Sequence, residues 1–189
     1  MPKNSLRRKL LSRRHALPLE QQLAKSRAIQ TRFVATELFR EARSLGLYSP
    51  VNSEVLTDEI FSAALSAGKK VVFPRVREHH LDFIEVRGQE DLRKGAFGIQ
   101  EPVGEQVTPL NELDVLVVPG VVFDAQGGRL GYGKGFFDRG LDEKKLKPFL
   151  VGLCYEIQLV TFLPKENHDV LMDALVTERR MLWMKKRTF

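Results

Sequence analysis

The sequence has a single cysteine and no long hydrophobic run. One cysteine, Cys154, excludes an internal disulfide framework and a cysteine-rich metal site. The longest apolar runs, such as 115–118 and 121–123, are far shorter than the roughly 20 residues of a membrane-spanning helix. The amino terminus is basic but lacks the apolar core and small-residue cleavage site of a secretory signal. These absences predict a cytoplasmic protein with no membrane partner.

Internal repeats, low-complexity tracts and linker-like Gly/Ser/Pro stretches are also missing. We therefore expect one domain over residues 1–189. Hydrophobic residues make up 43% of the 189 residues and charged residues 29%, which is typical of a globular protein. A chain of this length buries a sizeable core without disulfide bonds.

Acidic residues are absent from the first 14 positions. The six lysines and arginines of this segment account for the whole net charge of +6, and a second basic run, 179–187, ends the chain. Such clusters favour an anionic ligand, either nucleic acid or a phosphorylated small molecule. Two solvated terminal segments give the same pattern. No aromatic RNA-binding signature or helix-turn-helix pattern accompanies the basic runs, so we expect no nucleic-acid partner.

Helix-like and strand-like segments alternate along the chain. The patterns predict helices over residues 2–15, 19–39 and 57–67, a loop-rich stretch over 88–112 and an exposed end over 179–186. They predict strands over 43–49, 69–73, 81–86, 114–118, 149–153 and 173–177. This alternation predicts an α/β fold with a mostly parallel sheet. Ligands bind beyond the carboxyl ends of such strands, so the loops after Ser49, Phe73, Val118 and Leu153 are candidate site loops.

The segment after the strand at 114–118 carries the strongest chemical signal. Five glycines fall between positions 127 and 135, before a segment that can form a helix. Glycine lets the backbone approach a ligand, and free N–H groups before a helix bind anions. Arg129 and Lys134 offer positive charge to phosphate oxygens, and Asp138 offers an oxygen ligand to Mg²⁺.

This segment matches neither standard phosphate motif. The Walker pattern runs from Gly128 to Lys134 but has Gly135 where a serine or threonine should follow. The dinucleotide pattern G-x-G-x-x-G lacks its third glycine. From the residues alone, a phosphate-binding loop and a glycine-rich surface hairpin both stay open.

The run from Asp114 to Arg139, which includes D-V-L-V-V-P-G and R-L-G-Y-G-K-G-F-F-D-R, closely resembles the signature of the 5-formyltetrahydrofolate cyclo-ligase family, also called methenyltetrahydrofolate synthetases. Further blocks resemble the same family in the same order. They are K-N-S-L-R at 3–7, Y-S-P with E-V-L-T at 48–57, and the segments 69–74, 95–102, 168–169 and 173–178. The resemblance covers nearly the whole chain.

The resemblance implies a three-layer α/β/α sandwich of Rossmann-like architecture and an ATP-dependent reaction. ATP and Mg²⁺ would drive 5-formyltetrahydrofolate to 5,10-methenyltetrahydrofolate, with release of ADP and phosphate. Phosphorylation of the formyl oxygen makes it a leaving group, and N10 then attacks the formyl carbon. The protein's task is positioning and charge stabilisation, so no catalytic nucleophile or strong base is expected. The enzyme is expected to be a monomer.

The resemblance also implies which residues contact each ligand. ATP is assigned to Lys3, Asn4, Ser5, Leu6, Arg7, Arg129, Leu130, Gly131, Tyr132, Gly133, Lys134, Gly135, Phe136 and Phe137. The folate substrate is assigned to Ser49, Glu54, Tyr132, Gly133, Lys134, Gly135 and Phe136, with Glu54 accepting the N–H groups of the pterin. Mg²⁺ is assigned to Asp138 and Asp173. Lys134 often corresponds to glycine in the family, so its charge is helpful but dispensable.

Two other classes of function stay open: a basic nucleic-acid-binding module, and an α/β relative without ligase activity that handles phosphorylated small molecules. The joint presence of Lys3, Arg7, Glu54, the glycine-rich segment and Asp138 favours the ligase, because only the ligase uses all of them. The reaction needs no acid–base pair, so we interpret His168-Asp169 as a structural loop. Cys154 follows an apolar strand and is interpreted as a small buried hydrophobe.

Overall fold

The structure is a computed structural model that describes residues 2–78, 80–95, 98–133, 135–137, 141, 148–164, 166 and 169–184. Its α-helices are α1 (Lys3–His15), α2 (Leu19–Val34), α3 (Glu37–Glu41) and α4 (Asp58–Ser66). The large sheet holds β1 (Ser44–Gly46), β2 (Lys70–Arg77), β3 (His80–Glu85), β6 (Val115–Val118), β9 (Phe149–Leu153), β11 (Ala174–Val176) and β12 (Met181–Trp183). Two small sheets pair β4 (Leu92–Lys94) with β5 (Gln100–Pro102), and β7 (Val122–Asp124) with β8 (Arg129–Leu130) and β10 (Leu159–Val160). Short 3₁₀ helices are η1 (Gln89–Asp91), η3 (Leu110–Glu112) and η4 (Glu156–Gln158).

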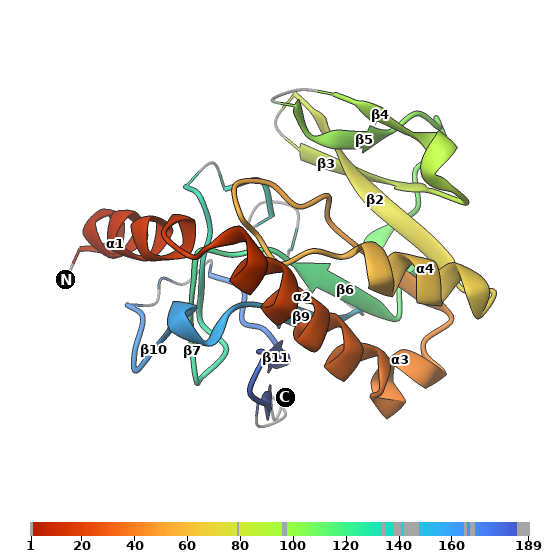
Figure 1. Cartoon of the computed structure of the whole chain (residues 1–189). Coiled ribbons are helices and arrows are strands. Elements are labelled where there is room, and N and C mark those ends of the chain that lie inside the picture. The colour runs from red at the N-terminus through yellow and green to blue at the C-terminus, as the bar shows by residue number, and fades with distance from the viewer. Residues whose placement is uncertain are drawn as a thin grey trace.

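The large sheet has the strand order β12-β11-β9-β6-β1-β2-β3 (Figure 1). Its inner strands are parallel, and the antiparallel strands β12 and β3 close the two edges. In β6, Val115 and Val117 join one core cluster whereas Leu116 and Val118 join another. Because side chains alternate along a strand, this pattern means that both faces are buried. The predicted α/β fold with a mostly parallel sheet is confirmed.

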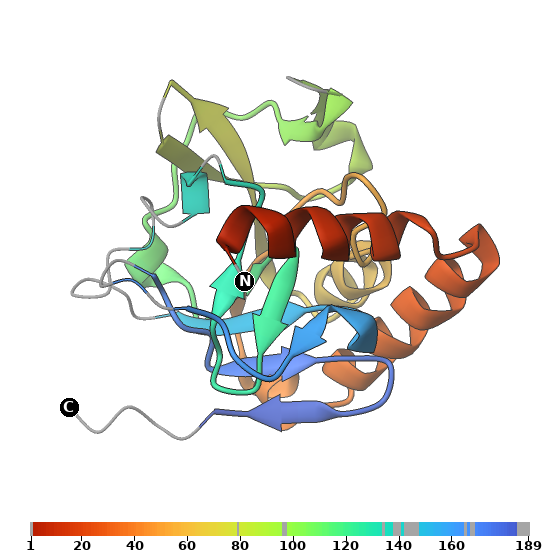
Figure 2. The same ribbon diagram turned by 90° about the vertical axis from the view of Figure 1, so that its left-hand side faces the viewer.

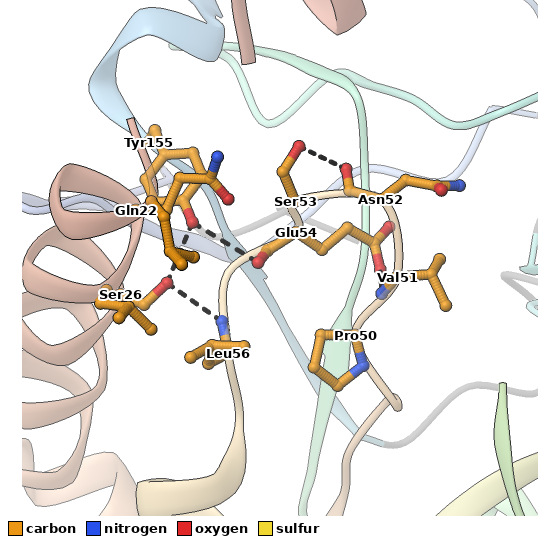
Figure 3. A pocket seen from close by; sticks show the side chains of 11 residues that line it. Gln22, Ser26, Pro50, Val51, Asn52, Ser53, Glu54, Leu56 and Tyr155 are labelled. Carbon is orange, nitrogen blue, oxygen red and sulfur yellow. Dashed lines mark hydrogen bonds between the residues drawn. The ribbon is translucent and has the colours of Figure 1, made fainter. Parts of the chain in front are cut away.

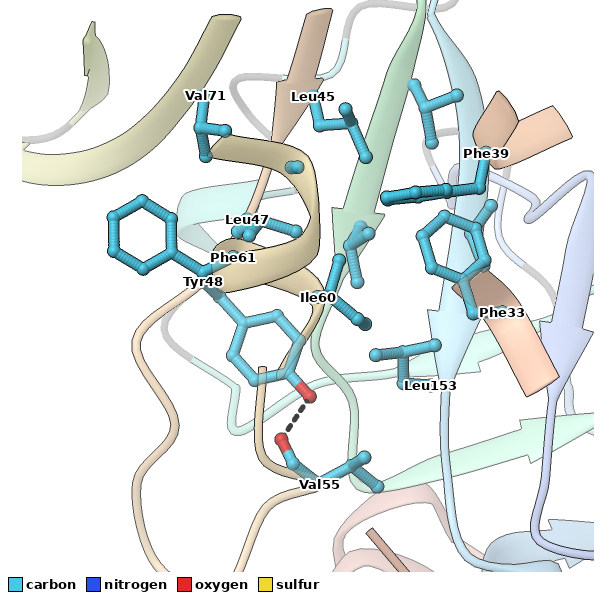
Figure 4. Packing of buried hydrophobic residues seen from close by; sticks show 14 of the residues in the cluster. Phe33, Phe39, Leu45, Leu47, Tyr48, Val55, Ile60, Phe61, Val71 and Leu153 are labelled. Carbon is cyan, nitrogen blue, oxygen red and sulfur yellow. Dashed lines mark hydrogen bonds between the residues drawn. The ribbon is translucent and has the colours of Figure 1, made fainter. Parts of the chain in front are cut away.

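Helices α2, α3 and α4 cover one face of the sheet. Phe33 of α2 meets Phe39 of α3 edge to face, with ring centroids 5.7 Å apart, and Ile60 of α4 packs beside them (Figure 4). On the other face, the described residues that cover the strands include Phe123, Leu141 and Met172. Cys154 lies in this second cluster and is fully buried, as the sequence predicts. The helix expected after the glycine-rich segment falls mainly on 138–140 and 142–147, outside the described residues.

Two helix predictions meet different outcomes. The helix over 2–15 is confirmed by α1. The single helix over 19–39 is wrong, because α2 ends at Val34 and α3 begins at Glu37. The Thr36 hydroxyl accepts a hydrogen bond from the backbone of Phe39 at 3.1 Å and caps the new helix. A threonine that satisfies backbone donors in this way favours a restart over a continuous helix.

Pro74 does not end its strand. β2 continues to Arg77, and Pro74 pairs with Phe83 of β3. β1 ends opposite Val72, so β2 has only β3 as a neighbour in this sheet beyond that point. Proline is tolerated on such an edge, because its missing N–H faces no partner strand. The loop predicted over 88–112 contains the β4–β5 hairpin, and part of the exposed end predicted over 179–186 forms β12.

Helix α1 lies across the hairpin of β7 and β8 (Figure 2). Its apolar residues Leu6 and Leu10 pack in one cluster with Val121, Val122 and Leu130. The hairpin turn is held by the buried carboxylate of Asp124, which accepts hydrogen bonds from the backbone of Gln126 and Gly128. This packing fixes the basic helix against the segment that leads into Gly131–Phe137. No helix in the described part of the chain is long and apolar enough to cross a membrane.

Candidate active site

A largely apolar cavity of about 340 Å³ opens at the carboxyl edge of the parallel sheet. The segments that follow β1 and β6 reach it, as expected from the loops after Ser49 and Val118. It is lined by Tyr48, Ser49, Val51, Asn52, Glu54, Pro74, Val76, Leu81, Ile99, Glu101, Pro119, Arg129, Gly131, Tyr132, Gly133, Gly135, Phe136 and Phe137. The structure therefore brings together every described residue to which the sequence assigns the folate substrate. Lys134 lies outside the described residues.

The glycine-rich segment divides into two parts with different tasks. Gly127 and Gly128 form the turn between β7 and β8, where Gly127 has a φ of 83° and an added Cβ would lie 2.5 Å from the carbonyl oxygen of Met172. Gly131, Gly133 and Gly135 instead line the cavity. The surface-hairpin interpretation thus holds for the first two glycines, and the ligand-loop interpretation remains for the last three.

Gly133 marks the point where α1 meets the cavity. Its φ is 96°, and an added Cβ would lie 3.3 Å from the guanidinium carbon of Arg7. Arg7 donates from Nε to the carbonyl oxygen of Gly131 at 2.7 Å and from Nη1 to the side chain of Asn4. Glycine is needed here because both the backbone conformation and the close helix disfavour a side chain.

Glu54 is the buried acid of the large cavity. Its Oε2 atom accepts a hydrogen bond from the backbone of Val51 at 3.0 Å, and only 6% of the residue is exposed. Burial raises the pKa of Glu54 to about 7, although the hydrogen bond from Val51, the charge of Arg14 and the hydroxyl of Tyr132 act in the opposite direction. Near neutral pH this carboxyl group is therefore close to half ionised.

Arg14 is a residue of this region that the sequence reasoning missed. It is 1% exposed, and its guanidinium donates to the carbonyl oxygens of Gly120 at 3.2 Å and Asn52 at 2.8 Å, and to the hydroxyl of Tyr132. In the sequence it is one cation in a basic run. The available signal is its spacing, since Lys3, Arg7, Leu10 and Arg14 recur every three or four residues and share one helix face.

A second, very small cavity of about 10 Å³ lies on the other side of Arg129. Arg129 is 7% exposed, donates to the carbonyl oxygen of Pro119 at 3.2 Å, and lines both cavities. Lys3 also lines the small cavity, and its Nζ lies 2.9 Å from Asp169 and 3.1 Å from Glu166. Burial lowers the pKa of Lys3, but these two acids outweigh it and the pKa stays above its usual value. Asp169 thus belongs to a group of charged side chains beside this cavity, in addition to the loop role expected for His168-Asp169 from the sequence.

Of the remaining residues that the resemblance assigns to ATP, some line a cavity and others do not. Leu130 lines the small cavity, whereas Leu6 packs in the core under α1. Asn4 contacts Arg7, and Ser5 lines none of the cavities described for this chain. Phe137 lines the large cavity beside Phe136.

The structure does not bring Asp173 to these cavities. It precedes β11 at the amino edge of the sheet, and its carboxylate accepts a hydrogen bond from the backbone of Leu150 at 2.8 Å. Asp138, the other residue assigned to Mg²⁺, lies outside the described residues. Within the described ranges, no three or more histidine, cysteine or acidic side chains gather in a group that could hold a metal ion.

A third cavity, of about 210 Å³, lies between α2 and the segment 50–56 (Figure 3). Tyr155 and Ser26 form a buried hydrogen bond of 3.0 Å at its base, and the Ser26 hydroxyl accepts from the backbone of Leu56 at 3.2 Å. Val51, Asn52 and Glu54 line both this cavity and the large one. The turn that carries Glu54 is therefore a thin partition between two spaces.

The fold and the site together define a class: an α/β protein with a cavity of small-molecule size at the carboxyl edge of a mostly parallel sheet, next to a group of cationic side chains. More particularly, the chain belongs to the 5-formyltetrahydrofolate cyclo-ligase family, whose family model matches residues 1–178. It is 39% identical to a 5-formyltetrahydrofolate cyclo-ligase of Haemophilus influenzae over 72% of this chain and 77% of that protein. It is 33% identical to the Escherichia coli K12 protein of the same name over 89% of this chain and 96% of that protein.

Solved structures support the same family. An NMR structure of Aquifex aeolicus 5,10-methenyltetrahydrofolate synthetase superposes with a TM-score of 0.89 at 33% identity, over 100% of this chain and 96% of that one. A Mycoplasma pneumoniae 5,10-methenyltetrahydrofolate synthetase gives a TM-score of 0.77 at 26% identity, over 94% of this chain and 99% of that one.

Proposed function

We propose that the protein converts 5-formyltetrahydrofolate to 5,10-methenyltetrahydrofolate while ATP is converted to ADP and phosphate. The observation that carries this proposal is the large cavity, where Ser49, Glu54 and the segment around Tyr132 surround one space beside Lys3, Arg7 and Arg129. The names of the related proteins in Haemophilus influenzae and Aquifex aeolicus support the same activity.

The large cavity suits a flat, partly polar ring system. Leu81, Ile99 and Phe136 offer apolar surface for the pterin and the ring attached to it. Ionised Glu54 is an acceptor-only group and suits the N–H groups at the edge of a pterin. Its burial strengthens such a hydrogen bond, because water does not compete for it.

Cationic side chains next to this cavity suit the phosphates of ATP. Arg129 lines both cavities, so it is placed to contact the phosphoryl group at the point where that group meets the folate. Lys3 is held by Asp169 and Glu166, and a phosphate that binds there takes over the same ammonium group. Arg7 holds the backbone of Gly131 against α1 and completes the cationic side of the site.

The reaction needs positioning rather than a protein nucleophile. A bond forms between the formyl oxygen and the γ-phosphorus as ADP leaves; N10 then attacks the formyl carbon and loses its proton, and phosphate departs with the former formyl oxygen. The first step proceeds when the formyl oxygen, the γ-phosphorus and the leaving oxygen of ADP are held in line, and the second when N10 is held next to the formyl carbon. In this chain the aromatic and glycine residues of the segment 131–137 hold the folate, and Arg129 stabilises the charge on the transferred group.

Magnesium is part of the proposal as the counter-ion of ATP, with Asp138 as the residue that holds it. Asp173 is engaged by the backbone of Leu150, so we derive no metal contact from it. Asp138→Asn should raise the Mg²⁺ concentration needed for half-maximal turnover, because an amide is a weaker ligand than a carboxylate. Asp173→Asn should leave that concentration unchanged and instead lower the melting temperature. The opposite pair of results would indicate that Asp173, rather than Asp138, holds Mg²⁺.

The direct test is absorbance detection of methenyltetrahydrofolate on mixing the protein with 5-formyltetrahydrofolate and MgATP. We expect one ADP for each product molecule. Product formation without nucleotide would refute the proposal, as would ATP hydrolysis that does not respond to formylfolate.

The proposal places the enzyme in the cytoplasm as a monomer without a nucleic-acid partner. Lys3, Arg7 and Arg14 all contact protein groups rather than facing solvent alone, which weakens the nucleic-acid alternative. Size-exclusion chromatography with light scattering should give the mass of one chain, and added RNA should not shift it.

A further inference from the structure

Arg14 reaches three segments that all lie far from it in the chain. From α1 it donates to the carbonyl oxygen of Gly120 after β6, to that of Asn52 in the turn Val51–Glu54, and to the hydroxyl of Tyr132 after β8. Its guanidinium carbon also lies 5.6 Å from the centre of the Tyr132 ring. The planar guanidinium supplies several donors in a fixed geometry, so one buried side chain joins three separate pieces of backbone and side chain.

Two of these pieces line the folate cavity of the proposed function. Asn52 and Tyr132 are both lining residues, whereas Arg14 is not. Tyr132 accepts from Arg14, which leaves its own proton to donate, and the Asn52 side chain and the Glu54 carboxyl both interact with this hydroxyl. Arg14 therefore acts on the cavity through other residues.

The turn that Arg14 holds is strained. Asn52 and Ser53 are consecutive non-glycine residues with φ values of 47° and 60°, and the backbone of Glu54 donates to the carbonyl oxygen of Val51 at 2.9 Å across the turn. Such conformations persist where surrounding contacts determine them. The contact from Arg14 to the carbonyl oxygen of Asn52 is one of these, and cavities on both sides leave the turn little packing of its own.

Arg14 also carries a cost that core packing alone does not explain. It is 1% exposed, and no carboxylate in the described part of the chain forms an ion pair with it. A buried guanidinium whose direct hydrogen-bond partners are all neutral oxygens is expensive compared with an apolar side chain of similar size, and the nearby Glu54 carboxyl, close to half ionised, offsets only part of this cost. A leucine or methionine would fill the same place beside Leu10 in the helix, so the charge and its donors have another task.

We propose that Arg14 is a positioning residue for the folate substrate: it holds the turn Val51–Glu54 and the Tyr132 side chain in the arrangement that binds 5-formyltetrahydrofolate. The proposal rests on the proposed function and deepens it. On this proposal, the folate cavity is complete only when α1 is packed in its observed position. The same helix also offers Lys3 and Arg7 to ATP.

The test compares two variants with a control on the same helix. Arg14→Met keeps the apolar stem and removes every donor, Arg14→Lys keeps the charge but not the fork, and Arg13→Met changes an exposed neighbour. We expect Arg14→Met to raise the KM for 5-formyltetrahydrofolate about tenfold or more and to change the KM for ATP less than threefold. Arg14→Lys should lie between Arg14→Met and the wild type, and Arg13→Met should match the wild type.

A double-mutant cycle with Tyr132→Phe separates positioning from general stability. Because part of the effect of Arg14 passes through the Tyr132 hydroxyl, the variant with both Arg14→Lys and Tyr132→Phe should lose less folate affinity than the two single losses added together. The cycle uses Arg14→Lys, so it remains informative if Arg14→Met fails to fold. Equilibrium binding of 5-formyltetrahydrofolate without nucleotide should show the same ranking as KM.

Several results would overturn the inference without touching the proposed function. They are a wild-type folate KM in Arg14→Met, parallel rises of both KM values in the Arg14 variants, or fully additive effects in the cycle. Absence of methenyltetrahydrofolate formation by the wild-type protein would instead refute the proposed function. The two failures are therefore distinguishable in one set of measurements.

Discussion

The two cavities that meet at Arg129 are built in opposite ways. The large one is lined mainly by apolar and aromatic side chains and by backbone, with Glu54 as a buried acid. Among the described residues, the small one has three charged lining residues, Lys3, Arg129 and Asp169, and Lys3 is already paired with Asp169 and with Glu166. Packing thus forms the large cavity, whereas the small cavity is bordered by ion pairs that a phosphate bound there, as proposed, would have to exchange. The first should be nearly insensitive to salt and the second clearly sensitive, because exposed charges are screened.

The largest effect should follow the loss of the residue that both cavities share. We expect Arg129→Ala to lower kcat/KM more than about 100-fold, since charge-assisted hydrogen bonds contribute about 1.5–3 kcal/mol each and Arg129 lines both cavities. Arg129→Lys should recover part of the loss, and Arg93→Ala, an exposed control on β4, should cost nothing. A loss below tenfold in a folded Arg129→Ala protein would show that the two cavities do not share a reacting centre.

The second-largest effect should follow substitution of Glu54, the buried acid of the large cavity. Glu54→Gln should weaken formylfolate binding about 10- to 30-fold at pH 8, where the wild-type carboxyl is ionised. Since the pKa of Glu54 lies near 7, wild-type kcat/KM for formylfolate should fall as the pH drops below 7, whereas the variant should lose this limb of the profile. A limb of equal steepness in both proteins would assign the titration to another group.

The same substitution should have the opposite effect on stability. Burial raises the pKa of Glu54 from 4.5 to about 7 in the folded state, so folding favours the protonated form and the free energy of unfolding falls as the pH rises through this range. At pH 8 the free protein should gain up to roughly 3 kcal/mol from Glu54→Gln, at 1.36 kcal/mol for each pKa unit. At pH 4.5 the gain should largely vanish, which denaturant titrations at the two pH values can measure.

On the phosphate side, Lys3→Ala and Arg7→Ala should each cost about tenfold in kcat/KM for ATP, equivalent to about 1.4 kcal/mol. Arg8→Ala, exposed on the same helix, is the matched control and should have little effect. The losses at Lys3 and Arg7 should shrink at high salt, in contrast to the loss at Glu54. Equal, small effects at all three positions would show that these side chains of α1 are solvated and do not bind ATP.

The smallest effect should come from an acid that competes with phosphate. Glu166 is 55% exposed and shares Lys3 with Asp169, so Glu166→Gln should leave the helix in place and lower the KM for ATP about two- to threefold, a typical size for an exposed ion pair. Glu105→Gln, which removes another exposed ion pair, should leave this KM unchanged. A raised KM for ATP in Glu166→Gln would mean that Glu166 assists phosphate binding rather than competes with it.

The sequence predicts the buried parallel strands well, because their apolar runs are continuous. The strand over 149–153 has the same bounds in the structure, and that over 114–118 differs by one residue. β7, β8 and β10 are too short to show a periodicity, and they form because Asp124 and the neighbouring chain satisfy the backbone. β12 exists because it pairs with β11, a contact that no local pattern in its own residues can indicate.

The site divides in the same way. The resemblance assigns ligand contacts to Ser49, Glu54 and the segment 131–137. These residues lie in short contiguous blocks or just after a strand, so a local sequence pattern can identify them. The role of Arg14 could not be predicted from the sequence, since its partners lie 38, 106 and 118 positions away and only the fold brings them together. The raised pKa of Glu54 could not be predicted either, because it depends on how completely neighbouring segments remove water from the carboxyl group.

Cys154, at the end of β9, has a consequence for the reactivity of the whole protein. Its thiol is fully buried, and burial together with the charges of Glu156 and Glu178 raises its pKa. Alkylating reagents and thiol oxidants act on an accessible thiolate, so the folded enzyme presents them with no reactive cysteine. Modification at this position must pass through molecules whose sheet has opened, and the rate of thiol labelling therefore measures how often the central sheet comes apart.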